Sequence, residues 1–60
     1  ELYPESSNVY NSLGEGLLAD KQYDESLRSY RKSVKLDPSN AGGKKAIEQI
    51  ERLLSQQNQR

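Results

Sequence analysis

The chain has 60 residues, and its nine Lys and Arg residues balance nine Asp and Glu residues, so its formal net charge at pH 7 is zero. It contains no cysteine, histidine, tryptophan, methionine or phenylalanine, and 32% of its residues are hydrophobic. These counts exclude disulfides and thiolate metal sites, and they predict one small domain with a thin core. Without histidine the usual general base near neutral pH is missing, so we expect a non-enzymatic chain with no cofactor or metal.

The charges cancel in total but are unevenly distributed along the chain. Residues 1–25 carry six acidic residues and one basic residue, whereas residues 26–60 carry eight basic residues and three acidic ones. Such a separation can orient a module on a partner. No apolar run approaches the roughly 20 residues of a membrane span, so we expect no membrane partner.

The first predicted helix covers about residues 7–20, and Ser6 or Ser7 can cap its start. Its apolar side chains recur at helical spacing and form one stripe: Tyr10, Leu13, Leu17 and Leu18. The second predicted helix covers about residues 22–36, because Pro38 prevents its continuation. Its stripe has the same helical spacing: Tyr23, Leu27, Tyr30 and Val34.

A third helical segment is predicted after "DPSN", where Ser39 or Asn40 can act as N-cap. One face of this segment is apolar and comprises Ala46, Ile47, Ile50, Leu53 and Leu54. We expect it to fray into the polar tail "SQQNQR".

The chain also repeats itself with a period of 34 residues. At this offset Pro4 pairs with Pro38, and Leu13 pairs with Ile47. Residues 7–40 resemble a tetratricopeptide repeat, whose period and helix-turn-helix plan they share. Five positions carry the resemblance: the first aromatic Tyr10, the pair Leu13-Gly14, and the later markers Tyr23, Tyr30 and Pro38.

The resemblance implies an all-α fold, an antiparallel helix-turn-helix repeat followed by a capping helix. Residues 1–6 would end a preceding repeat, residues 7–40 would form the repeat, and residues 41–60 would form the capping helix and a polar tail. Together these three helices would make a fragment of a right-handed superhelical solenoid.

Two glycines, Gly14 and Gly16, interrupt the first helix in "SLGEGLLADKQY". A phosphate-binding loop is not indicated, because Ala19 stands at the third glycine position of G-x-G-x-x-G and no strand precedes it. The resemblance instead implies that Gly14 lets two antiparallel helices approach closely. Ser26 and Ser33 replace alanines of the family, and their hydroxyls can bond back to a carbonyl one turn earlier. The implied helix-packing signature is Tyr10, Leu13, Gly14, Leu17, Tyr23, Ser26, Leu27, Tyr30, Ser33 and Pro38.

For function, the resemblance implies a non-catalytic module for protein-protein interaction or scaffolding. First helices of such repeats line a groove that binds a protein or peptide partner. The groove residues would be Asn8, Asn11, Glu15, Leu18 and Ala19. Asn11 and Glu15 stand where a clamp for a C-terminal carboxylate needs lysine and asparagine, so that ligand is not expected.

A second hypothesis is an accessory C-terminal domain of a bacterial serine hydrolase, an esterase or β-lactamase-like enzyme. The stretch from Tyr3 to Asn40 is similar to repeats in the tails of such proteins, and the partner would then be the parent chain's own catalytic domain. The active site would lie outside this chain, which contains neither Ser-x-x-Lys nor Gly-x-Ser-x-Gly.

Two charged features favour structural roles over chemistry. The basic stripe of the second helix could meet nucleic acid, but the zero net charge argues against that partner; it comprises Arg28, Arg31, Lys32 and Lys35. The acidic pair Asp24 and Glu25 lies where negative charge stabilises the start of a helix.

A last expectation concerns self-association. Leu2, Tyr3 and the side of the first helix around Val9 and Leu17 would remain partly exposed without a preceding repeat. We therefore expect a homodimer that buries this face.

Overall fold

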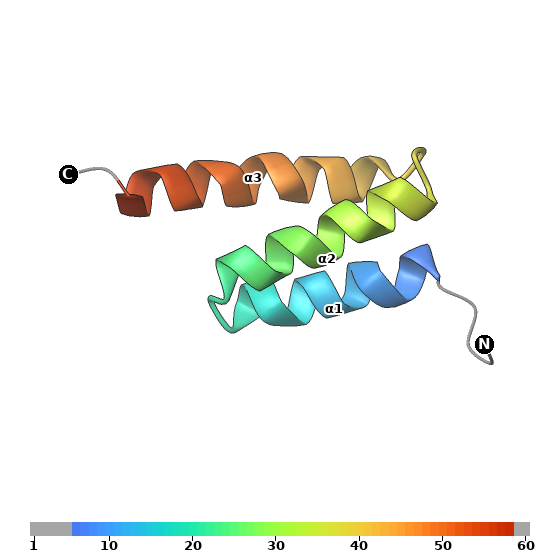
Figure 1. The fold of residues 1–60 in the computed structure, drawn as a ribbon, viewed down its shortest axis with the longest axis horizontal. Coiled ribbons are helices and arrows are strands. Elements are labelled where there is room, and N and C mark those ends of the chain that lie inside the picture. The colour runs from blue at the N-terminus through green and yellow to red at the C-terminus, as the bar shows by residue number, and fades with distance from the viewer. Residues whose placement is uncertain (1–5, 59–60) are drawn as a thin grey trace.

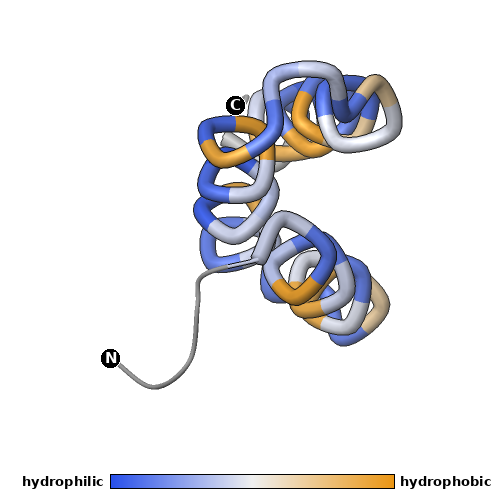
Figure 2. Tube along the Cα trace, turned by 90° about the vertical axis from the view of Figure 1, so that its right-hand side faces the viewer, coloured by the Kyte–Doolittle hydropathy of each residue, from blue (hydrophilic) through white to orange (hydrophobic). Residues whose placement is uncertain are grey.

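The computed structural model describes residues 6–58, which form three helices and no strand. These are α1 (Ser7–Ala19), α2 (Tyr23–Leu36) and α3 (Ala41–Asn58). In Figure 1, α2 lies between α1 and α3 and runs antiparallel to both. Figure 2 shows the helices as an arc, with α1 and α3 displaced to the same side of α2. The expected all-α helical repeat fold is confirmed.

The turn between α1 and α2 closes through two backbone hydrogen bonds typical of a Schellman motif. Lys21 N–H donates to the carbonyl of Leu18 at 3.0 Å, and Gln22 N–H donates to the carbonyl of Leu17 at 2.9 Å. This geometry needs a left-handed residue just after the helix, and Lys21 has φ of 62°. A non-glycine residue there bears a conformational cost of about 1–2 kcal/mol.

Asn40 begins α3, as one of the two predicted caps. Its Oδ1 accepts a hydrogen bond from Gly43 N–H at 3.0 Å, which satisfies one donor of the first turn. The preceding turn is closed by Asp37, whose Oδ1 accepts from the Ser39 hydroxyl at 2.7 Å and the Ser39 N–H at 3.2 Å. These bonds, led by the one from the hydroxyl, lower the pKa of the Asp37 carboxyl.

α3 continues to Asn58, so the described part of the tail, residues 55–58, is helical and not frayed as expected, whereas Gln59 and Arg60 lie outside the described residues. Glutamine is a good helix former, and the tail contains neither glycine nor proline to end the helix.

Helices α1 and α2 pack closely because Gly14 has no side chain. A Cβ atom at Gly14 would lie 2.8 Å from Cδ2 of Tyr30, so the tyrosine ring occupies the space that a side chain would need. Tyr30 is 4% exposed. The role in helix packing that the sequence predicts for Gly14 therefore has a defined partner.

Ser26 and Ser33 join the same two helices through hydrogen bonds. The hydroxyl of Ser26 donates to the carbonyl of Gly14 at 2.7 Å, and the hydroxyl of Ser33 donates to the carbonyl of Ser7 at 2.8 Å. The prediction that these hydroxyls bond within their own helix was wrong. Both serines are fully buried, and the carbonyls of α1 are within their reach because the helices approach so closely.

The contact between α2 and α3 is centred on Ile50, which is completely buried. Gly43 allows the start of α3 to approach α2, since a Cβ there would lie 3.0 Å from Cγ2 of Val34. On the surface, Arg31 and Glu51 join the two helices through an ion pair of 3.0 Å. Among the described hydrophobic side chains only Tyr30 and Ile50 are buried, which agrees with the thin core expected from composition.

Leu13, which the sequence groups with the packing residues, does not enter this core. It is 49% exposed, and Val9, one turn earlier, is 60% exposed. α2 covers the side of α1 that carries Gly14, so side chains on the opposite side are left uncovered. The predicted exposure of Val9 is found, whereas Leu2 and Tyr3 lie outside the described residues.

Candidate partner-binding surface

The five predicted groove residues lie along one face of α1. Asn8, Glu15 and Ala19 are exposed, whereas Asn11 and Leu18 are half-buried. Their spacing places them within one stripe of the helix. Asn11 fixes the direction of this stripe, because its side chain contacts Asn40 at the start of α3. The face therefore turns toward the side of α2 on which α3 also lies.

Asn11 is held in place by hydrogen bonds to both sides. Its Oδ1 accepts from Nδ2 of Asn40 at 3.3 Å, and its Nδ2 donates to Oε2 of Glu15 at 3.4 Å. Asn40 Nδ2 also donates to the hydroxyl of Ser33 at 2.9 Å. Asn40 thus connects α3 to both α1 and α2.

Sequence reasoning named Asn40 as one of two candidate caps, with Ser39, and missed this second role. The signal for the cap is local, since "DPSN" precedes an amphipathic segment. The bonds to Asn11 and Ser33 join residues 29 and 7 positions away. They depend on the packing of three helices, which no local pattern encodes.

Glu15 is the single charged residue of α1, and its negative charge acts on the buried ring of Tyr30 in α2. Burial raises the pKa of Tyr30, and the negative charge of Glu15 raises it further. The candidate surface is therefore weakly acidic and otherwise uncharged on α1. It offers amide groups at Asn8 and apolar area at Leu18 and Ala19.

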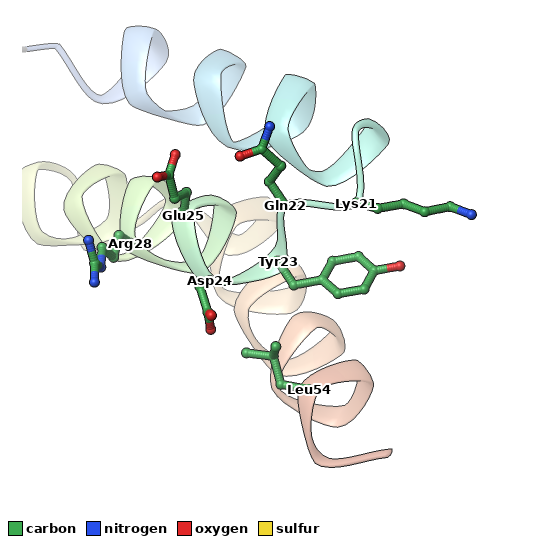
Figure 3. A pocket seen from close by; sticks show the side chains of 7 residues that line it. All are labelled: Lys21, Gln22, Tyr23, Asp24, Glu25, Arg28 and Leu54. Carbon is green, nitrogen blue, oxygen red and sulfur yellow. The ribbon is translucent and has the colours of Figure 1, made fainter. Parts of the chain in front are cut away.

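A separate hollow of about 440 Å³ lies where the turn between α1 and α2 meets α3. Figure 3 shows that its polar side chains do not converge: Lys21 and Tyr23 extend away from Arg28, and Glu25 and Asp24 point to different sides. General acid–base catalysis needs groups aimed at one reacting atom. The described residues of this hollow do not supply that arrangement, and the acidic pair is not assembled as a site.

Two members of the basic stripe are engaged within the chain. Arg31 pairs with Glu51, and the ammonium of Lys32 lies 5.7 Å from the ring centroid of Tyr10. A nucleic-acid surface needs cations free to meet phosphates. Arg31 and Lys32 instead contact side chains of this chain, Glu51 and Tyr10 respectively.

Within the described part of the chain, no group of three or more His, Cys, Asp or Glu side chains could hold a metal ion. The helices found among these residues are also too short or too polar to cross a membrane.

The architecture defines a class: a helix-turn-helix repeat followed by one further helix that packs on its second member. The family model described as Tetratricopeptide repeat matches residues 7–40, which is more than half of the chain. The chain therefore belongs to the tetratricopeptide repeat family.

Among curated proteins, the chain is similar to Small glutamine-rich tetratricopeptide repeat-containing protein 2 of Mycosarcoma maydis. The two are 35% identical over 52 residues, which cover 87% of this chain and 15% of the relative. The chain thus spans a small part of that relative's length. No solved structure matches the chain significantly.

Proposed function

We propose that the chain is a non-catalytic interaction module whose α1 face binds a peptide segment of a partner protein. The observation that carries this proposal is the division of α1 into two sides. The side with Gly14 is closed by Tyr30, whereas the side with Asn8, Glu15 and Ala19 stays accessible. Membership of the tetratricopeptide repeat family supports the same conclusion, because such repeats generally bind proteins.

The chemistry of the face limits what it can bind. Its single charge on α1 is the negative charge of Glu15, so a C-terminal carboxylate finds no cation there. Asn8 can donate and accept hydrogen bonds to an extended backbone. Leu18 and Ala19 offer apolar contact area. A peptide that meets this face through its main chain and small apolar side chains fits these groups.

Selection of peptides from a displayed random library on the immobilised chain, followed by nuclear magnetic resonance titration of the selected peptides, tests the proposal. The expected result is amide shift changes along the face of Asn8, Glu15 and Ala19. Free-acid and amidated forms of each peptide should bind equally.

Ala19→Arg should block the selected peptides, because Ala19 is exposed and a long side chain there covers the face. Leu13→Arg provides a matched control, since Leu13 is 49% exposed and lies about 160° around the same helix from Glu15. Selection of no binder, or shift changes confined to other helices, would contradict the proposal.

The alternative role, accessory domain of a bacterial serine hydrolase, requires a catalytic domain formed by residues outside this chain. The comparisons relate the chain to a tetratricopeptide repeat protein and give that role no support. We therefore place the function in the repeat itself.

A further inference from the structure

A series of hydrogen bonds leads from the backbone of α3 to the candidate binding face of α1. It begins at the N–H of Gly43, which donates to Oδ1 of Asn40 at 3.0 Å. Nδ2 of Asn40 donates to Oδ1 of Asn11 at 3.3 Å, and Nδ2 of Asn11 donates to Oε2 of Glu15 at 3.4 Å. Each nitrogen meets an oxygen, so all the bonds of this series run in one direction.

The direction of the series is set at Gly43. A backbone N–H can only donate, so the oxygen of the Asn40 carboxamide must face it and the nitrogen must face the other way. Nδ2 of Asn40 also donates to the hydroxyl of Ser33 at 2.9 Å, which holds the same orientation. Turning the Asn11 carboxamide over would then set N–H against N–H at Asn40 and oxygen against oxygen at Glu15. Asn11 is therefore held in one of the two orientations that its shape allows.

We propose that Asn40 is a positioning residue for peptide binding, because it fixes the direction in which Asn11 meets the main chain of the peptide. This inference rests on the proposed function of the α1 face. A carboxamide has two N–H donors and two acceptor lone pairs. Among residues 6–58, Asn11 uses one of each, so one donor and one acceptor remain for the N–H and C=O groups of a peptide.

Glu15 makes the orientation of Asn11 matter for the peptide. Its carboxylate is exposed and can only accept, so it suits a peptide N–H. In the observed orientation the nitrogen of Asn11 lies toward Glu15, so a donor stands beside an acceptor. Each residue of a peptide likewise carries one N–H and one C=O. The reversed orientation would place two acceptors side by side and weaken binding, although no side chain leaves the face.

Asn40→Asp reverses the series without removing the helix cap. Aspartate caps helices about as well as asparagine, so one carboxylate oxygen still accepts from Gly43 N–H. The other oxygen can only accept, so Asn11 must turn Nδ2 toward α3. The affinity for peptides selected on the unmodified chain should fall roughly tenfold, the equivalent of one or two unmade hydrogen bonds. Asn40→Ser keeps a cap but leaves Asn11 free to adopt either orientation, so its loss should be smaller.

Two controls separate positioning from a general effect on α3. Ala41→Asp adds the same charge at an exposed residue next to Asn40, and it should leave the affinity unchanged. Asn40→Asp should also have almost no further effect once Asn11→Ala has removed the carboxamide, because a residue that acts through Asn11 has no effect without it. A merely structural role of Asn40 would weaken binding equally in both backgrounds.

Nuclear magnetic resonance of the free chain gives a readout that needs no peptide. The Nδ2 protons of Asn11 should show nuclear Overhauser contacts to the side-chain methylene groups of Glu15, and Asn40→Asp should abolish them. Contacts that persist in Asn40→Asp, or an equal loss of affinity in both backgrounds, would overturn the inference. Peptide binding to the unmodified chain tests the proposed function separately, because the orientation of Asn11 is measured without a ligand.

Discussion

Gly14→Ala should destabilise the chain although alanine is the better helix former. In an exposed helix the replacement stabilises by about 0.5–1 kcal/mol. At Gly14, however, the new Cβ would lie 2.8, 2.9 and 3.1 Å from three ring carbons of Tyr30, including Cγ at the root of the side chain. The ring cannot rotate away from all three, and it is 4% exposed, so the helices must separate. Overpacking of this kind costs about 1–3 kcal/mol, which leaves a net loss of about 1–2 kcal/mol.

Gly16→Ala provides the matched comparison, because it makes the same chemical change in the same helix. With nothing within 4 Å of the new methyl group, only the gain in helix propensity remains. The two variants should therefore differ by about 2 kcal/mol, or about 8–16 °C in melting temperature for a domain of this size. Circular dichroism melts of both variants measure this difference. A melting temperature for Gly14→Ala at or above that of the unmodified chain would refute the close contact with Tyr30.

Three further outcomes test other parts of the structure. Lys21→Gly should stabilise by about 1 kcal/mol in urea denaturation, because glycine adopts the observed φ of 62° without strain; a loss of stability would contradict the Schellman turn. Ser33→Ala should reduce the free energy of unfolding by about 1–3 kcal/mol, since three polar groups lose its hydroxyl: the Ser7 hydroxyl, the Ser7 carbonyl and Nδ2 of Asn40; Ser26→Ala, which removes a single bond, should cost less. The Tyr30 phenol should titrate above its ordinary pKa of 10.0, so its contribution to stability is complete below pH 10 and is lost as the pH rises through the folded pKa. Absorbance titration measures this shift, which Glu15→Gln should reduce only in part because burial is its first cause; an ordinary pKa would contradict the packing of the ring.

The helices were predictable because their signals are local. The second predicted helix, at about residues 22–36, and the observed α2, Tyr23–Leu36, differ by one residue at the start. Apolar side chains that recur at intervals of three or four residues specify each helix, and Pro38 ends the second one. The tail of α3 was the exception. Its polar residues were expected to leave the helix, whereas helix propensity alone permits it to continue.

Partners between helices could not be predicted in the same way. The small side chains of Ser26 and Ser33 indicated close approach, but only the register of α1 against α2 decides which carbonyl each hydroxyl reaches. Leu13 illustrates the related limit for apolar side chains. The hydrophobic stripe of α1 is wide enough to contact two other helices, and its sequence does not tell which part of it α2 covers. In the structure α2 covers the part near Gly14 and leaves Leu13 exposed.

Gly14 and Gly16 show how the same residue type serves two different surfaces of one helix. Two residues along an α-helix correspond to a rotation of about 200°, so Gly16 must face away from α2 when Gly14 faces it. Gly14 is explained within the chain, because Tyr30 occupies the space of its missing side chain. Gly16 costs the helix about 0.5–1 kcal/mol relative to alanine, and no contact among the described residues offsets that cost. An uncompensated loss beside the exposed Val9 and Leu13 is understandable if a further helix approaches there, as a neighbouring repeat does in stacked arrays of this family.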